Sequence, residues 1–155
     1  MDLNPKLTGF REWKKNLAGL FFPVYKSVRA PIVAAATSND TTLIIPAGSI
    51  IIGAFVKVNT AEATGGTKTI DVGVSGGDED GFIDGLSVAA TGTILPTLAD
   101  GSATVGALLK VDESGGDYVP EGHVCAAATT IAYTLGSDDF AELDAEIFIG
   151  YIDPS

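Results

Sequence analysis

Short apolar segments separated by glycine-rich turns run through most of this 155-residue chain and limit the folds open to it. From Ala30 onward no stretch shows a convincing helical repeat of apolar residues. Turn clusters rich in Gly, Ser, Asn and Asp recur at about ten-residue intervals, a spacing typical of all-β sandwiches. They separate candidate strands at residues 30–37, 41–45, 50–58, 67–74, 86–90, 93–98, 103–111, 124–135 and 145–152. The pattern predicts a jelly-roll-like antiparallel β-sandwich.

The first 29 residues do not follow this pattern. Apolar residues recur there at helical spacing (Phe10, Trp13, Leu17, Leu20 and Phe21), and the basic residues Arg11, Lys14 and Lys15 lie off that stripe. Pro23 ends the repeat, which predicts a short amphipathic helix near residues 9–20. A helix this short is marginal in water. We therefore expect residues 1–29 to be an extended basic arm that anchors on a surface, and residues 30–155 to be the sandwich domain.

Charge divides the chain at the same boundary. Residues 1–29 hold six basic and two acidic residues, whereas residues 30–155 hold three basic and eighteen acidic ones. The formal net charge of the whole chain is −11. A body this acidic repels nucleic acid, whose phosphates attract clustered Lys and Arg. A basic amphipathic arm suits either a membrane surface or a groove on a protein, and its several apolar anchors favour the protein. We expect no nucleic-acid partner and no membrane partner.

Two segments of the predicted body resemble each other. Residues 48–58 align without gaps on residues 101–111, and six of the eleven positions are identical, including Gly53 with Gly106. One interpretation is that they form related halves of a sheet. The other is that they are unrelated strands with similar turn requirements. The sequence leaves both open.

Few residues could support catalysis. His123 is the single histidine and follows a turn, which favours a loop or strand-edge residue. Cys125 is the single cysteine, and its small apolar neighbours predict a buried thiol that packs as a small hydrophobic group. A nucleophile–base pair of these two residues lacks a third group to orient the base. We expect no catalytic residues and no enzyme activity.

An acidic turn at residues 78–85 has some features of a calcium loop. The helix-flanked loop of twelve residues requires an oxygen ligand at its fifth position and a glutamate at its twelfth. Phe82 and Ala89 occupy those positions, so the motif is absent. An acidic solvated turn is the simpler interpretation, and an irregular calcium site is the alternative. We assign no metal site and no cofactor.

An ordered series of short motifs resembles virion proteins of tailed bacteriophages. The series comprises TLIIPAGSII at residues 42–51, VKVNTA at 56–61, TIDVG at 69–73 and DEDGF at 78–82. It is similar to the beginning of the jelly-roll sandwich in capsid decoration (cement) proteins and head fibres. The resemblance covers residues 41–84 and a closing strand at 147–152, and it does not cover the arm.

The resemblance implies a homotrimeric structural protein, made in the host cytoplasm, that binds the major capsid protein and stabilises the phage head from the capsid surface. Apolar anchors and steering charges on the arm would make the contact; these are Phe10, Arg11, Trp13, Lys14, Lys15, Leu17 and Phe21. One alternative is a tail, fibre or baseplate adaptor protein of the virion. Another is a carbohydrate-binding β-sandwich, for which the body offers few aromatic residues.

Overall fold

The computed structural model describes residues 24–33, 38–63, 66–99, 103–112, 118–136 and 140–153, so the predicted helix and anchors of the arm lie outside the described residues. The described elements are almost all strands. They are β1 (Val24–Val33), β2 (Ser38–Ile45), β3 (Ile50–Thr60), β4 (Thr69–Val74), β5 (Ile83–Ser87), β6 (Gly92–Ile94), the 3-10 helix η1 (Ala107–Leu109), β7 (Lys110–Asp112), β8 (Tyr118–Pro120), β9 (His123–Val124), β10 (Thr129–Leu135) and β11 (Asp144–Asp153).

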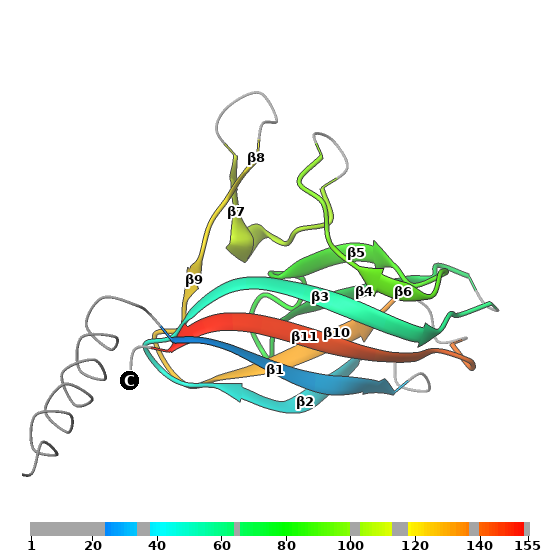
Figure 1. Cartoon of the computed structure of the whole chain (residues 1–155), viewed down its shortest axis with the longest axis horizontal. Coiled ribbons are helices and arrows are strands. Elements are labelled where there is room, and N and C mark those ends of the chain that lie inside the picture. The colour runs from blue at the N-terminus through cyan, green and yellow to red at the C-terminus, as the bar shows by residue number, and fades with distance from the viewer. Residues whose placement is uncertain are drawn as a thin grey trace, which may run out of the picture.

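Two antiparallel sheets form a sandwich (Figure 1). Sheet A has the strand order β1-β11-β3-β6, with the short β9 also paired to β3, and sheet B has the order β2-β10-β4-β5. The first four strands alternate between the sheets, and the last two long strands, β10 and β11, each insert between earlier strands. This is the connectivity of a jelly roll. The predicted all-β antiparallel sandwich is confirmed.

The core lies between the sheets and consists of alternate side chains of the long strands. On β11 every second residue from Ala145 to Asp153 is buried, as a strand with one face toward a core requires. The largest fully buried apolar side chains are Tyr133, Phe82, Ile45, Ile51, Ile70, Ile83, Ile131, Leu135, Ile147, Ile149 and Val56. Cys125 is 1% exposed and belongs to this core, so the predicted buried thiol is confirmed.

The first strand begins earlier than the sequence pattern predicted. β1 starts at Val24 and pairs along its whole length with β11, so Lys26 and Arg29 lie in sheet A rather than in an arm. The strand predicted at residues 30–37 includes Pro31, and a proline is tolerated there because β1 is an edge strand of sheet A. Lys26 forms an ion pair with the buried Asp153 of β11, and this hydrogen bond raises the pKa of Lys26.

The prediction of one long strand at residues 103–111 is wrong. The segment contains an isolated bridge at Val105, then η1, then the three-residue β7. The similar residues 48–58 lie mostly in β3, so the two segments are not equivalent halves of a sheet. Their shared glycines show why: a Cβ on Gly106 would lie 2.1 Å from the carbonyl oxygen of Asp80, whereas a Cβ on Gly53 would have no neighbour within 4 Å. The strand predicted at 124–135 is likewise divided, into β9 and β10.

Candidate interaction surfaces

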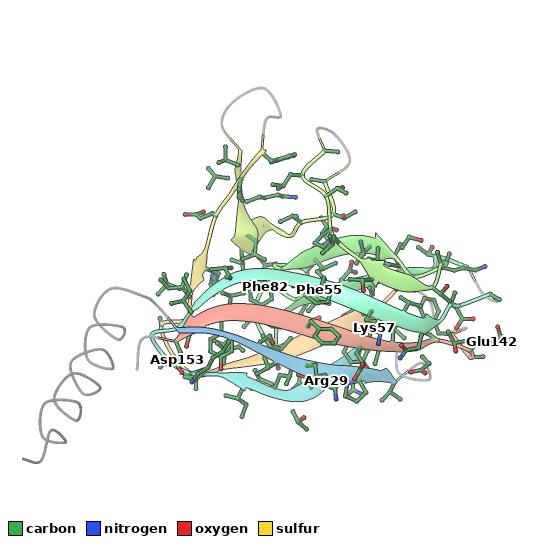
Figure 2. All side chains as sticks on the ribbon, in the orientation of Figure 1. Arg29, Phe55, Lys57, Phe82, Glu142 and Asp153 are labelled. Atoms are coloured by element: carbon green, nitrogen blue, oxygen red, sulfur yellow. The ribbon has the colours of Figure 1, made fainter. Side chains whose placement is uncertain are left out.

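The outer face of sheet A carries a stacked pair of aromatic rings. Such faces of antiparallel sheets are usually polar, because they point to solvent. Here Arg29, Phe148 and Phe55 form one row across β1, β11 and β3. The rings of Phe55 and Phe148 stack with centroids 4.8 Å apart and planes within 2°. Figure 2 shows Phe55 and Lys57 along β3 and Arg29 on β1.

Further apolar residues extend this row toward the end of sheet A where β9 joins. Gly150 and Gly53 lie opposite each other, and neither places a side chain beside the rings. Ile52 lies at an irregularity in the β3–β11 register and is 46% exposed, and Val124 of β9 is 58% exposed. We call the set Ile52, Gly53, Phe55, Val124, Phe148 and Gly150, with the basic Arg29 and Lys57 beside it, the sheet A face.

The sheet A face carries charges of both signs, because Glu146 lies beside Arg29 and opposite Lys57. Five basic residues occur at the described positions, and two of them, Arg29 and Lys57, lie on this face. The Arg29 guanidinium is 3.4 Å from the Glu146 carboxylate of the neighbouring strand, and Lys57 lies opposite the same residue. Large apolar groups rimmed by charge on an otherwise polar outer face are typical of a protein interaction site.

A second unusual surface is the hairpin of β7 and β8, which stands away from both sheets in Figure 1. Val111 and Val119 pair across it and are 41% and 38% exposed. The Lys110 ammonium lies 4.8 Å from the centre of the Tyr118 ring, in a cation–π contact. An isolated two-stranded hairpin is only marginally stable in water. A partner that covered the exposed valines would therefore stabilise this hairpin.

The base of the hairpin is fixed to the sandwich. Leu108 N–H donates to the carbonyl oxygen of Gly81 at 2.8 Å, and Gly106 N–H donates to that of Phe82 at 3.1 Å. Leu109 is buried in the core. At the other strand, Glu121 N–H donates to the carbonyl oxygen of Leu109 at 2.9 Å. The hairpin therefore projects from a rigid base in a defined direction.

A pocket of about 390 Å³ lies at the acidic turn and is lined by Asp71, Gly77, Asp78, Glu79, Asp80 and Thr134. Burial raises the pKa of Asp71, although its Oδ1 accepts the Gly85 N–H at 2.6 Å. A hydrogen bond with Asp80 raises the pKa of Asp78, and burial adds to the effect. Within the described ranges no group of three or more His, Cys, Asp or Glu residues is placed to hold a metal ion. The calcium alternative therefore gains no support.

We expect Asp78→Asn to stabilise the protein at neutral pH. Because the folded state holds the Asp78 proton more tightly than the unfolded chain, this group's contribution is present below its ordinary pKa of 3.8 and is lost as the pH rises through the raised value. The melting temperature of Asp78→Asn should therefore exceed that of the wild type at pH 7, and the difference should shrink toward pH 4. Glu79→Gln, in the same turn, controls for the removal of one charge. Identical pH profiles of the two variants would contradict the prediction.

Among the described residues singled out in the sequence, His123 lies beside the acidic turn, where it contacts Phe82 and interacts electrostatically with Asp78. His123 lies in β9, and its ring packs against the Phe82 ring in a T-shaped arrangement, with centroids 5.7 Å apart. Every proposed anchor of the arm, from Phe10 to Phe21, is outside the described residues. Sequence reasoning missed the sheet A face, since strand periodicity does not say which of two apolar faces points outward. No helix in the described segments is long and apolar enough to cross a membrane.

Comparison of the fold with solved structures finds similar proteins, whereas comparison of the sequence with known families and curated proteins finds none. No protein-family model and no curated protein matches the chain. A chain of the acidic stable capsid structure of Helicobacter pylori bacteriophage KHP30 is similar with a TM-score of 0.50 and 13% identity, over 85% of this chain and 90% of that one. A chain of the capsid asymmetric unit of cyanophage Pam1 has a TM-score of 0.54 and 15% identity, over 86% and 88%. At these identities the likeness shows a shared fold.

Proposed function

We propose that this chain is a structural protein of a phage virion, and specifically a capsid decoration (cement) protein that works as a homotrimer on the capsid surface. The observation that carries the proposal is the match to chains from two phage capsid structures, which extends over nearly the whole of both chains in each pair. A match of this extent means that the neighbours are similar in length to this chain and share its fold over most of that length. The described surfaces also favour docking over catalysis.

The proposed partner is the major capsid protein of the same particle, and the proposed anchor is the arm. The residues assigned to this contact are Phe10, Arg11, Trp13, Lys14, Lys15, Leu17 and Phe21. Because β1 begins at Val24, the arm that is free to bind ends before that residue. A few aromatic and basic side chains usually supply most of the energy of a protein contact. The acidic body keeps free copies soluble by mutual repulsion until they dock.

We expect the full-length variant Phe10→Ala/Trp13→Ala to lose at least about tenfold in affinity for capsids, since truncating two aromatic anchors removes more than 1.4 kcal/mol of contact energy. Binding is measured by cosedimentation with expanded heads that lack the protein. Lys68→Glu, a charge reversal in the sandwich, is the control and should bind as the wild type does. Undiminished binding of the Phe10/Trp13 variant would rule out the arm as the anchor.

The number of copies per particle tests the location independently. A decoration protein covers the lattice, so cryo-electron microscopy of intact virions should show this sandwich repeated over the whole head. A few copies at one vertex or along the tail would instead favour the alternative of a tail or baseplate adaptor. Wild-type protein that binds no head and no tail, but binds a defined glycan, would overturn the proposal in favour of a carbohydrate-binding module.

A further inference from the structure

The arm is joined to the sandwich at one end of sheet A. β1 begins at Val24, which pairs with Asp153 at the end of β11. At the same end β9 pairs with the beginning of β3, so that Val124 lies opposite Ile50. The start of β1 and the short β9 lie at the same end of the sandwich in Figure 1. We call Val24, Ile52, Val124 and Asp153 the arm end of the sandwich.

The arm end exposes two large apolar side chains. Ile52 is 46% exposed and Val124 is 58% exposed. The adjoining Gly53 leaves the surface beside Ile52 flat, since even a Cβ there would meet nothing within 4 Å. Lys26, at the same end of the sheet, is paired with the buried Asp153. An exposed apolar patch of this kind is typical of a surface that a partner covers.

Backbone hydrogen bonds hold the arm end in shape. Gly48 N–H donates to the carbonyl oxygen of Cys125 at 2.7 Å, and Cys125 N–H donates to that of Ser49 at 2.8 Å. These two bonds fix the residue after β9 to the turn that leads into β3. A partner therefore meets Ile52 and Val124 in fixed positions, so little conformational entropy is lost when it binds.

The length of the linking chain limits the distance between the arm end and the partner of the arm. Phe21 is the last anchor assigned to the arm, and only Phe22 and Pro23 separate it from Val24. Because consecutive Cα atoms are about 3.8 Å apart, the Cα atoms of Phe21 and Val24 are separated by at most about 11 Å. Neighbouring strands are about 4.8 Å apart, so β3 lies only about 10 Å from β1. A surface that Phe21 contacts is therefore within reach of the arm end.

We propose that the arm end of the sandwich makes a second contact with the capsid protein that the arm binds, and that Ile52 and Val124 dock on an apolar patch of its outer surface. The inference rests on the proposed function and adds a contact made by the folded domain. Two contacts joined by a short chain bind more tightly than either alone, because the first raises the effective concentration of the second. The second contact also fixes the orientation of the sandwich on the head.

Substitution of exposed apolar residues at the two ends of sheet A tests the contact. In the full-length protein, Ile52→Ser/Val124→Ser should lose at least about tenfold in affinity for expanded heads, because two aliphatic side chains no longer bury their surface in the contact. Val33→Ser is the matched control and should bind as the wild type does. Val33 is 50% exposed and lies opposite Asp144, at the other end of β1 and about 30 Å from Val24.

Two further measurements separate this contact from other causes. Melting temperatures establish that each variant is folded. Sedimentation velocity without heads should give the same oligomeric state for the wild type, for Ile52→Ser/Val124→Ser and for Val33→Ser, because the proposed contact is made with the capsid and not between copies of this chain.

Three results would overturn the inference. The first is undiminished binding of Ile52→Ser/Val124→Ser to heads. The second is an equal loss of binding in Val33→Ser, which would show that the effect is not confined to the arm end. The third is a changed oligomeric state of Ile52→Ser/Val124→Ser without heads, which would show that a second copy covers the arm end.

The failure of this inference is distinguishable from that of the proposed function. Wild-type protein that binds no head contradicts the proposed function, and the inference with it. Wild-type protein that binds heads, and whose binding depends on Phe10 and Trp13 but not on Ile52 and Val124, contradicts the inference alone.

Discussion

Glu62→Ala should lower the free energy of unfolding by about 3 kcal/mol, a large part of the 5–15 kcal/mol typical of a domain. Glu62 is 1% exposed, and its Oε2 accepts the backbone N–H groups of Ala141, Glu142 and Leu143 at 3.0, 3.0 and 3.1 Å. One carboxylate thus holds the segment that leads into β11. Without it, the buried Leu143 N–H loses its acceptor, while the N–H groups of the exposed Ala141 and Glu142 can turn to water.

Urea denaturation followed by circular dichroism measures this effect. Glu62→Gln keeps an oxygen acceptor but loses the charge. Because hydrogen bonds to charged groups are roughly twice as strong as neutral ones, this variant should lower the free energy of unfolding by about half as much as Glu62→Ala does. Glu142→Ala removes an exposed carboxylate from the same segment and should change stability by no more than about 0.5 kcal/mol. Equal losses in Glu62→Ala and Glu142→Ala would show that the three hydrogen bonds do not hold the segment.

Gly106→Ala should lower the free energy of unfolding even further, by about 4 kcal/mol or more. Its Cβ would lie 2.1 Å from the carbonyl oxygen of Asp80 and 2.2 Å from the carbonyl carbon of Gly81. These are backbone atoms, so no side-chain rotation relieves the clash. The hydrogen bond from Gly106 N–H to Phe82 must then break or bend, and the base of the hairpin must move away from the acidic turn.

The chain offers its own control for this substitution. Gly53 occupies the matching place in the similar segment 48–58, yet a Cβ there meets nothing within 4 Å. Gly53→Ala should therefore be neutral or should stabilise the protein by about 0.5 kcal/mol, because it restricts the unfolded chain. Thermal melts of the two variants, measured side by side, test this difference in stability. A Gly106→Ala protein as stable as Gly53→Ala would mean that the close approach of the two turns is not required.

The fold class followed from the sequence because alternation and turns are local signals. Residues 145–152 were predicted as a strand and lie within β11, and residues 41–45 lie within β2. Prediction failed where a tertiary contact overrides the local pattern. Gly106 lies in a segment that has the sequence of a strand, but its packing against the acidic turn stops a long strand from forming. Residues 24–29 were assigned to the basic arm, but their pairing with the distant β11 makes them part of β1.

The candidate surfaces were less predictable than the fold. Residues 50–56 are apolar on both faces of β3 except at Gly53, so the pattern cannot distinguish the inward Ile51 from the outward Phe55. The stack of Phe55 on Phe148 depends on a register between strands far apart in sequence. The exposed valine pair of the hairpin depends likewise on pairing. The arm remains a prediction from composition and periodicity.

The position of β11 has a consequence for how the protein is made. This strand lies between β1 and β3 and forms most of the pairing within sheet A. A nascent chain on the ribosome cannot complete sheet A until residues 144–153 have emerged, and β1 must wait unpaired until then. Folding that depends on such distant contacts is slow and leaves strand edges open to aggregation. The chain is therefore most open to aggregation in the interval before β11 is inserted.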